Sequence, residues 1–237
     1  NFTTATNSLN TAVGYFAGLN TTTGEQNTLI GGQAGKALIT GVQNVAVGVD
    51  SLESDTDGCR NVAVGYNALT TQNFTSATNS ENTAVGWSAG AAVTTGTLNT
   101  FIGAKAGDAT DDGSGNTAVG AEALSANCGN NNTATGRYAL TNCTGGNNTA
   151  IGDQAGNNCT SGSNNSFLGK DAGITGSPGG NLTTGSNSIF VGDENIDGAH
   201  IQIDWTVASD ERDKTDFTDL DIGLDFVKAM KPYTFRW

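Results

Sequence analysis

One short pattern repeats along most of this chain: asparagine, two small or β-branched residues, an aliphatic residue and a closing glycine, as in Asn82-Thr83-Ala84-Val85-Gly86. Ten copies occur, at intervals of 16 or 17 residues with one interval of 21, and a degenerate eleventh copy ends at Gly192. A fixed short period predicts a solenoid, in which each repeat forms one coil that stacks on the next. The closing glycines are Gly14, Gly31, Gly48, Gly65, Gly86, Gly103, Gly120, Gly136, Gly152 and Gly169.

Each coil carries strand chemistry between its asparagine and its closing glycine, because Thr, Ala and Val or Ile alternate there. A second glycine usually stands three residues before the next asparagine, as Gly96 does before Asn99. Two glycine-marked turns per coil leave room for two short strands. We therefore expect an all-β repeat fold, a parallel β-solenoid or β-roll whose coils at ~4.8 Å spacing give a rod roughly 50 Å long.

The asparagines form a column along the predicted stack, and the column has a structural role. Stacked side-chain amides can hydrogen-bond from coil to coil, as in cross-β ladders. Alternatively, asparagine only tolerates the turn conformation at the start of the strand. The column consists of Asn10, Asn27, Asn44, Asn61, Asn82, Asn99, Asn116, Asn132, Asn148 and Asn165.

A coil of 16 or 17 residues encloses little space, yet its strands carry Ala, Val and Ile on both sides. One face can fill the interior of the coil, whereas the other face stays apolar and without a partner. Self-association about an axis parallel to the stack would cover it, and three thin sheets close a triangular core. We expect a homotrimer, with a dimer or sheet-on-sheet pairing as the main alternative.

The residue after each closing glycine changes along the chain, from Tyr15, Tyr66 and Trp87 in the first half to charged residues in the second. Charge at this position indicates that it faces water. The three aromatic residues are therefore candidate receptor-binding residues, because exposed aromatic rings stack on sugars and anchor interfaces. The alternative is that they pack against the turns of a neighbouring subunit.

The charge of the chain excludes some classes of partner. A net charge of −13 argues against nucleic acid and against anionic membrane surfaces, which attract clustered Lys and Arg. No apolar run approaches the ~20 residues that cross a bilayer, so we expect no membrane insertion. The acidic pairs have no dedicated calcium-loop spacing, and we interpret them as solvated turns. These pairs are Asp55 with Asp57, Asp111 with Asp112, and Asp193 with Glu194.

Four cysteines are present, namely Cys59, Cys128, Cys143 and Cys159, without a CxxC pair and with one histidine, His200. This set argues against a zinc site, and we expect neither a metal nor a cofactor. Cys143 and Cys159 lie at the same position of their coils, within reach of a disulfide if the coils stack ~4.8 Å apart. The alternative is a column of buried thiols.

The composition changes after Gly192, where charged residues become much denser. We expect the shaft to span residues 1–192, a connecting strand to span 193–208, and the truncated start of another domain to span 209–237. Residues 201–207 alternate as in a strand, and apolar residues recur at helical spacing over 219–231.

The tail resembles the C-terminal intramolecular chaperone of phage tail fibres and tailspikes, the self-cleaving family that includes endosialidases. The resemblance lies in Ser209-Asp210-x-Arg212-x-Lys214-Thr215, Leu220-Asp221-x-Gly223-Leu224, Lys231-Pro232 and Arg236-Trp237. It implies an α+β module that assists trimerisation. It also implies a single self-cleavage before Ser209, with Ser209 as nucleophile and Lys214 as its base, which is chemistry that a lysine of lowered pKa supports.

The repeats resemble the heads of trimeric autotransporter adhesins, which implies a left-handed β-roll in trimers. Residues 1–14 also repeat at 73–86 with 12 identities in 14, so we expect this chain to be a fragment of a longer fibre. The two resemblances predict a virion tail fibre that binds a host cell-surface glycan or protein and joins other tail-fibre or virion proteins. A bacterial surface or extracellular adhesin is the alternative. A polysaccharide depolymerase is less favoured, because the acids of the shaft offer no facing pair.

Overall fold

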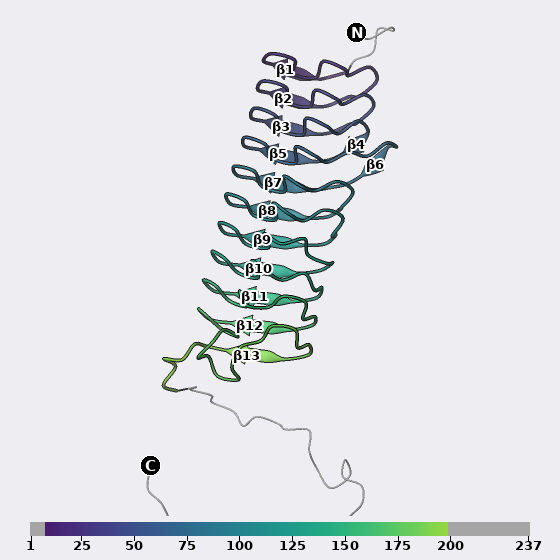
Figure 1. The fold of residues 1–237 in the computed structure, drawn as a ribbon. Helices are drawn as coiled ribbons and strands as arrows, with labels where there is room; N and C mark the ends of the chain where they lie inside the picture. Colours follow the sequence, from purple (N-terminus) through teal and green to yellow (C-terminus); the bar gives the residue numbers. More distant parts are fainter. Residues whose placement is uncertain (1–7, 199–237) are drawn as a thin grey trace, which may run out of the picture. The chain divides into compact units, whose positions relative to one another are not determined.

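A computed structural model describes residues 8–198, which form a parallel β-solenoid (Figure 1). Eleven short strands lie side by side in one sheet in chain order, and within the described range the chain forms no helix. The predicted all-β parallel solenoid is therefore confirmed. The strands of the sheet are β1 (Thr11–Val13), β2 (Thr28–Ile30), β3 (Val45–Val47), β5 (Val62–Val64), β7 (Thr83–Val85), β8 (Thr100–Ile102), β9 (Thr117–Val119), β10 (Thr133–Thr135), β11 (Thr149–Ile151), β12 (Ser166–Leu168) and β13 (Ile189–Val191).

Most coils contain one three-residue strand followed by turns, so the prediction of two strands per coil is wrong. The reason is that three positions per coil, besides the closing glycine, have left-handed backbone conformation even where the residue is not glycine. They are the second residue after the closing glycine, such as Lys105 with φ 55°, the fourth residue after it, such as Leu124 with φ 51°, and the residue before the asparagine, such as Leu98 with φ 61°. Strand conformation cannot continue through these positions, because β residues have negative φ.

The closing glycine is required for two reasons. Gly86 has φ +143°, a conformation that residues with a Cβ rarely adopt. A Cβ on Gly86 would also lie 2.3 Å from the carbonyl oxygen of Gly103, the closing glycine of the next coil. The same close approach of backbone to backbone recurs at nearly every closing glycine, so this column sets how tightly the coils stack.

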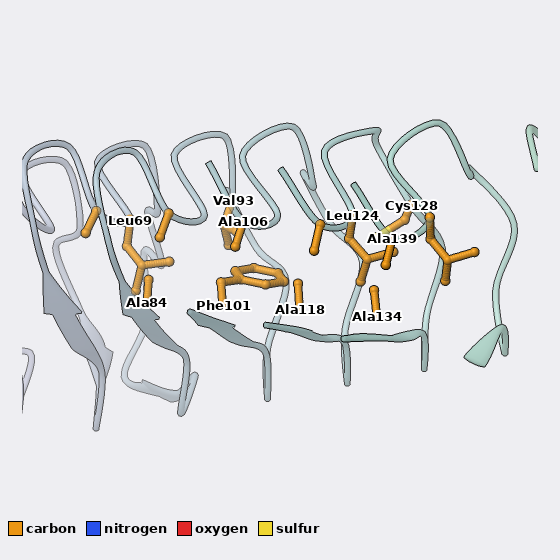
Figure 2. Packing of buried hydrophobic residues seen from close by; sticks show 14 of the residues in the cluster. Leu69, Ala84, Val93, Phe101, Ala106, Ala118, Leu124, Cys128, Ala134 and Ala139 are labelled. Carbon is orange, nitrogen blue, oxygen red and sulfur yellow. The ribbon is translucent and has the colours of Figure 1, made fainter. Parts of the chain in front are cut away.

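The interior is filled by two positions of each coil, whose volumes complement each other within a coil or between neighbouring coils. The middle residue of each strand points inward, and it faces the fourth residue after the closing glycine. Where the strand supplies Phe101, the facing position is Gly107, whose added Cβ would lie 2.5 Å from the ring. Where the strand supplies Ala118, the facing position is Leu124, and both are fully buried (Figure 2). Where both positions are small, as at Ala84 and Gly90, large side chains of the neighbouring coils take the space: a Cβ on Gly90 would lie 2.9 Å from Leu69 and 2.9 Å from Phe101.

The asparagine column lies inside the stack and bonds from coil to coil. The Oδ1 atom of Asn99 accepts a hydrogen bond from the backbone N–H of Asn116 at 2.9 Å. Its Nδ2 atom donates to the carbonyl oxygen of Gly113 at 2.9 Å. Amide-to-amide bonds also occur, as between Asn148 Nδ2 and Asn132 Oδ1 at 3.2 Å. Each asparagine thus satisfies backbone groups of the turn region that no strand partner reaches.

The interval of 21 residues produces an expanded coil, residues 65–86. Its extra residues leave the stack and form β6 (Thr78–Asn79), which pairs in parallel with β4 (Gly58–Cys59) of the preceding coil beside the main sheet (Figure 1). Phe74 of this segment turns back and is 8% exposed. The expected strand at 201–207 and helix at 219–231 lie outside the described residues.

Candidate functional site

The outer face of the main sheet is the candidate functional surface. The first and third residues of each strand point away from the interior, and they form two columns of Thr, Val, Ile and Leu that run along the stack. Ile102 is 41% exposed and Leu168 is 52% exposed. Parallel sheets are normally covered on both faces, so this apolar face is incomplete in a single chain. The third-residue column comprises Val13, Ile30, Val47, Val64, Val85, Ile102, Val119, Thr135, Ile151, Leu168 and Val191.

The three aromatic candidates lie beside this face and are exposed in the single chain. The exposed fractions are 71% for Tyr15, 49% for Tyr66 and 51% for Trp87. Tyr66 and Trp87 follow the closing glycines of β5 and β7, which are neighbouring strands in register, so they belong to successive coils. Val49, which is also exposed, occupies the same position one coil earlier. Tyr15 is separated from this group by Gly32, and the structure therefore gathers Tyr66 and Trp87 but not Tyr15.

A cation lies next to the aromatic pair. The Nζ atom of Lys105 is 5.3 Å from the centre of the Trp87 ring, a distance that suits a cation–π contact. Three coils after Trp87, the column of residues that follow the closing glycines becomes charged: Arg137 Nε donates to Asp153 Oδ1 at 3.0 Å. The Arg137 guanidinium lowers the pKa of Asp153. The column is therefore apolar in the first half and ionic in the second.

The acid Asp55 is buried, which corrects the expectation that the acidic pairs are solvated turns. Its Oδ1 atom accepts hydrogen bonds from the backbone N–H groups of Gly58 and Phe74, both at 3.0 Å. Its Oδ2 atom accepts one from Gln72 Nε2 at 2.6 Å. Burial raises the pKa of Asp55, whereas these hydrogen bonds oppose the rise. Asp57 is only half buried and bonds to the hydroxyl of Thr40.

Sequence reasoning missed the role of Asp55, although a signal was available. Asp55 and Gln72 both stand seven residues after their closing glycine. Most other coils place a small or apolar residue at this interior position, such as Leu38 or Val93. Two successive polar exceptions at an interior position indicate a buried polar pair.

All four cysteines are buried free thiols, and Cys143 and Cys159 occupy the same interior position, seven residues after the closing glycine. Burial raises the pKa of the Cys128 thiol, which bonds to the hydroxyl of Thr110 at 3.3 Å. The sulfur atoms of Cys143 and Cys159 are 2.7 Å apart. Of the two alternatives that the sequence left open for Cys143 and Cys159, this arrangement corresponds to the buried thiols.

The described residues offer little for a small ligand. A hollow of about 70 Å³ lies near Lys170, Asp171 and Asp193, far below the roughly 300 Å³ of a typical ligand pocket. No group of three or more metal-binding side chains occurs within residues 8–198. In the same range, no helix is long and apolar enough to cross a membrane. The self-cleavage candidates Ser209 and Lys214 lie outside the described residues.

Comparison with known proteins gives one finding. A family described as the chaperone of endosialidase matches residues 209–237. The matched segment begins at Ser209 and includes Lys214, in agreement with the resemblance found in the sequence. No curated protein and no solved structure matches the chain.

Proposed function

We propose that this chain forms part of a homotrimeric phage tail fibre, which attaches the virion to the host cell surface. The observation that carries the proposal is the unpartnered outer face of the main sheet. A column of Val, Ile and Leu that extends over nearly all coils is a continuous apolar surface, and monomeric proteins rarely leave such a surface in water.

Two further copies of the same chain are the partners that this face fits. Because the columns run parallel to the stack, three chains arranged about that axis bring three equivalent faces together. Each half-exposed Val or Ile that becomes buried contributes about 1 kcal/mol. The contribution is repeated in every coil, so the interface grows with the length of the shaft.

The chaperone match supports a tail fibre over a bacterial adhesin. In the family that the tail resembles, the segment assists trimer formation and is then released. A long repeat array benefits from such a segment, because identical coils can pair out of register unless the chains are aligned first.

The aromatic column supplies a surface for attachment. Tyr66 and Trp87, in successive coils, present two half-exposed rings, and aromatic rings stack on the apolar faces of sugars. Three chains would present three such surfaces, so that weak contacts add up to firm attachment.

The oligomeric mass in solution tests the trimer. Sedimentation equilibrium of the Ser209→Ala chain, which is expected to stay intact, should give three times the chain mass of 24.0 kDa. The parent chain is expected to sediment as a trimer of the cleaved or intact chain. The substitution Ile102→Lys, on the outer face, is expected to give monomers or aggregates. Thr95→Lys is the matched control, because Thr95 is also exposed but lies in a turn. A monomeric parent chain would contradict the proposal.

Binding to host cells tests attachment. Replacement of both Tyr66 and Trp87 by Ala is expected to weaken binding at least about tenfold, since each stacked ring is worth roughly 1 kcal/mol or more. Leu98→Ala is the control, because Leu98 is exposed in another column. Unchanged binding by a double variant that remains trimeric would remove these residues from the receptor site.

Mass spectrometry tests self-cleavage. The parent chain is expected to release residues 209–237 after assembly, whereas Ser209→Ala and Lys214→Ala are expected to stay intact. Equal cleavage of parent and variants would assign it to an outside protease.

A further inference from the structure

The interior column of small and apolar residues becomes a column of thiols in the second half of the shaft. Cys143 and Cys159 stand seven residues after the closing glycines of successive coils, and Cys128, in the coil before them, stands eight residues after its own. Each is at most 2% exposed. Earlier coils fill this position with residues such as Leu38 and Val93, so the packing of the coil does not itself demand sulfur.

Cys143 and Cys159 contact each other, whereas Cys128 and Cys59 contact other groups. Their sulfur atoms are 2.7 Å apart, which is direct contact. By contrast, Cys128 contacts the hydroxyl of Thr110, and Cys59 lies 3.5 Å from the backbone nitrogen of Val42.

The backbone holds this pair in place. The residue that follows Cys143 donates a backbone hydrogen bond to the residue that follows Cys159, from Thr144 N to Thr160 O at 2.5 Å. The strands of the two coils, β11 and β12, pair in register. Neighbouring coils at the ~4.8 Å strand spacing satisfy the Cα separation that a disulfide needs. The two sulfur atoms can therefore join without a shift of the coils.

The folded thiols are protected. The hydrogen bond between the two thiols raises the pKa of Cys143, with burial adding to the rise, and the same bond lowers the pKa of Cys159. Thiol–disulfide exchange also requires access to the thiolate, and both sulfur atoms are buried in the closed coils. Exchange is therefore confined to folding, or to moments when these coils open.

We propose that Cys143 and Cys159 form a disulfide between successive coils when the chain folds in the presence of a small disulfide such as oxidised glutathione. One cysteine thiolate attacks the small disulfide, forms a mixed disulfide and releases one reduced thiol. The second thiolate then attacks the protein sulfur of the mixed disulfide and releases the other. The two cysteines lose two protons and two electrons, and the small disulfide gains them.

The bond would close a loop of 16 residues and restrain the opening of the two coils. Each coil contacts only its neighbours, so if the two coils that carry Cys143 and Cys159 came apart, the shaft would be divided at that point. The disulfide therefore strengthens the shaft after assembly without altering its surface.

The parent chain alone supplies the main test. It is refolded in reduced and oxidised glutathione, any remaining thiols are alkylated under denaturing conditions, and the intact mass and the cysteine-containing peptides are measured. The expected result is the loss of two hydrogens, with Cys143 and Cys159 joined. No loss of hydrogens, or a bond between Cys128 and Cys143, would overturn the proposal.

Thermal unfolding of variants supplies the second test. Oxidation is expected to raise the Tm of the parent by several degrees, and the reductant tris(carboxyethyl)phosphine should remove the increase. Cys159→Ala is expected to abolish the redox-dependent shift. Cys128→Ala and Cys59→Ala are the matched controls and should retain it. A shift that persists in Cys159→Ala would contradict the assignment.

Discussion

A regular coil and the expanded coil fill the same interior position and satisfy their backbone groups with different side chains. In the regular coil that follows Gly86, the interior position holds Val93, and the side chain of Asn99 bonds only to the backbone of the next coil. In the expanded coil that follows Gly65, the same position holds Gln72. Gln72 donates to Asp55 in the preceding coil and accepts a hydrogen bond from Asn82 at 2.8 Å.

The difference shows how the stack tolerates a change of coil length. The extra residues depart from the stack as β6, and the backbone groups they would have satisfied need other partners. Ser80 supplies one of these partners, since its hydroxyl donates to Asn61 Oδ1 at 2.9 Å and lies 3.2 Å from the carbonyl oxygen of Cys59. Buried side chains thus replace the missing backbone bonds, and the ladder continues without a break.

The largest expected loss of stability comes from changing a closing glycine, which regular and expanded coils share. Gly103→Val places a side chain within 2.6 Å of the Gly120 carbonyl oxygen and forces a strained φ of +136°. We expect a loss of at least about 4 kcal/mol of stability, because the backbone itself blocks the new group. Circular dichroism during thermal unfolding measures the loss.

A matched glycine serves as the control. Gly32→Ala should change stability by less than about 0.5 kcal/mol, because the nearest atom to its Cβ is a Val49 methyl at 3.9 Å. Equal losses at both glycines would show that the closing column has no special role.

The next largest loss of stability is expected from removing Asp55, two of whose hydrogen bonds come from the expanded coil. Asp55→Ala leaves two backbone N–H groups and the amide of Gln72 without an acceptor, so we expect a cost of about 3 kcal/mol. Urea unfolding of parent and variant measures it. Asp112→Ala, at an exposed turn, is the control and should be nearly neutral. A small effect at Asp55 would mean that the polar network is not what supports the longer coil.

A smaller loss of stability is expected at the column asparagines, and it allows Asn99 of a regular coil to be compared with Asn82 of the expanded coil. Asn99→Ala removes bonds to Asn116 and Gly113, and we expect a cost of about 2 kcal/mol. Asn82→Ala removes the equivalent two bonds and the bond to Gln72, so it should cost about 1 kcal/mol more. The two variants are compared by the free energy of unfolding in urea. The reverse order would contradict the additional role of Asn82.

The smallest effect is a pH dependence. The pKa of Asp55 is raised from 3.8 mainly by burial, with the nearby charge of Asp57 adding to the rise. The folded state then holds this proton at a pH where the unfolded chain has released it. Stability from this group therefore rises as pH falls through the raised pKa, and levels off below 3.8. The difference in unfolding free energy between the parent and Asp55→Asn, from pH 7 to pH 4, should move in favour of the parent. A constant difference would show that Asp55 does not titrate in this range.

The parts of the fold that follow from the sequence are those that repeat. The period specifies the stack, the parallel register and the inward Ala positions, because every coil has to agree with its neighbours. The number of strands per coil did not follow, since Lys105 and Leu98 adopt left-handed conformations that their residue types do not announce. The buried Asp55 was also missed, because a single acid near a turn looks solvated until its position in the coil is compared with Val93 in another.

The direction of the asparagine hydrogen bonds has a consequence for how the chain is made. The Oδ1 of each asparagine accepts from the coil that follows it in sequence, and most Nδ2 groups donate to a glycine 14 residues later. A nascent coil on the ribosome is therefore completed as soon as the next 17 or so residues emerge. Growth can proceed one rung at a time, and the sequence distance between partners stays the same however long the shaft becomes.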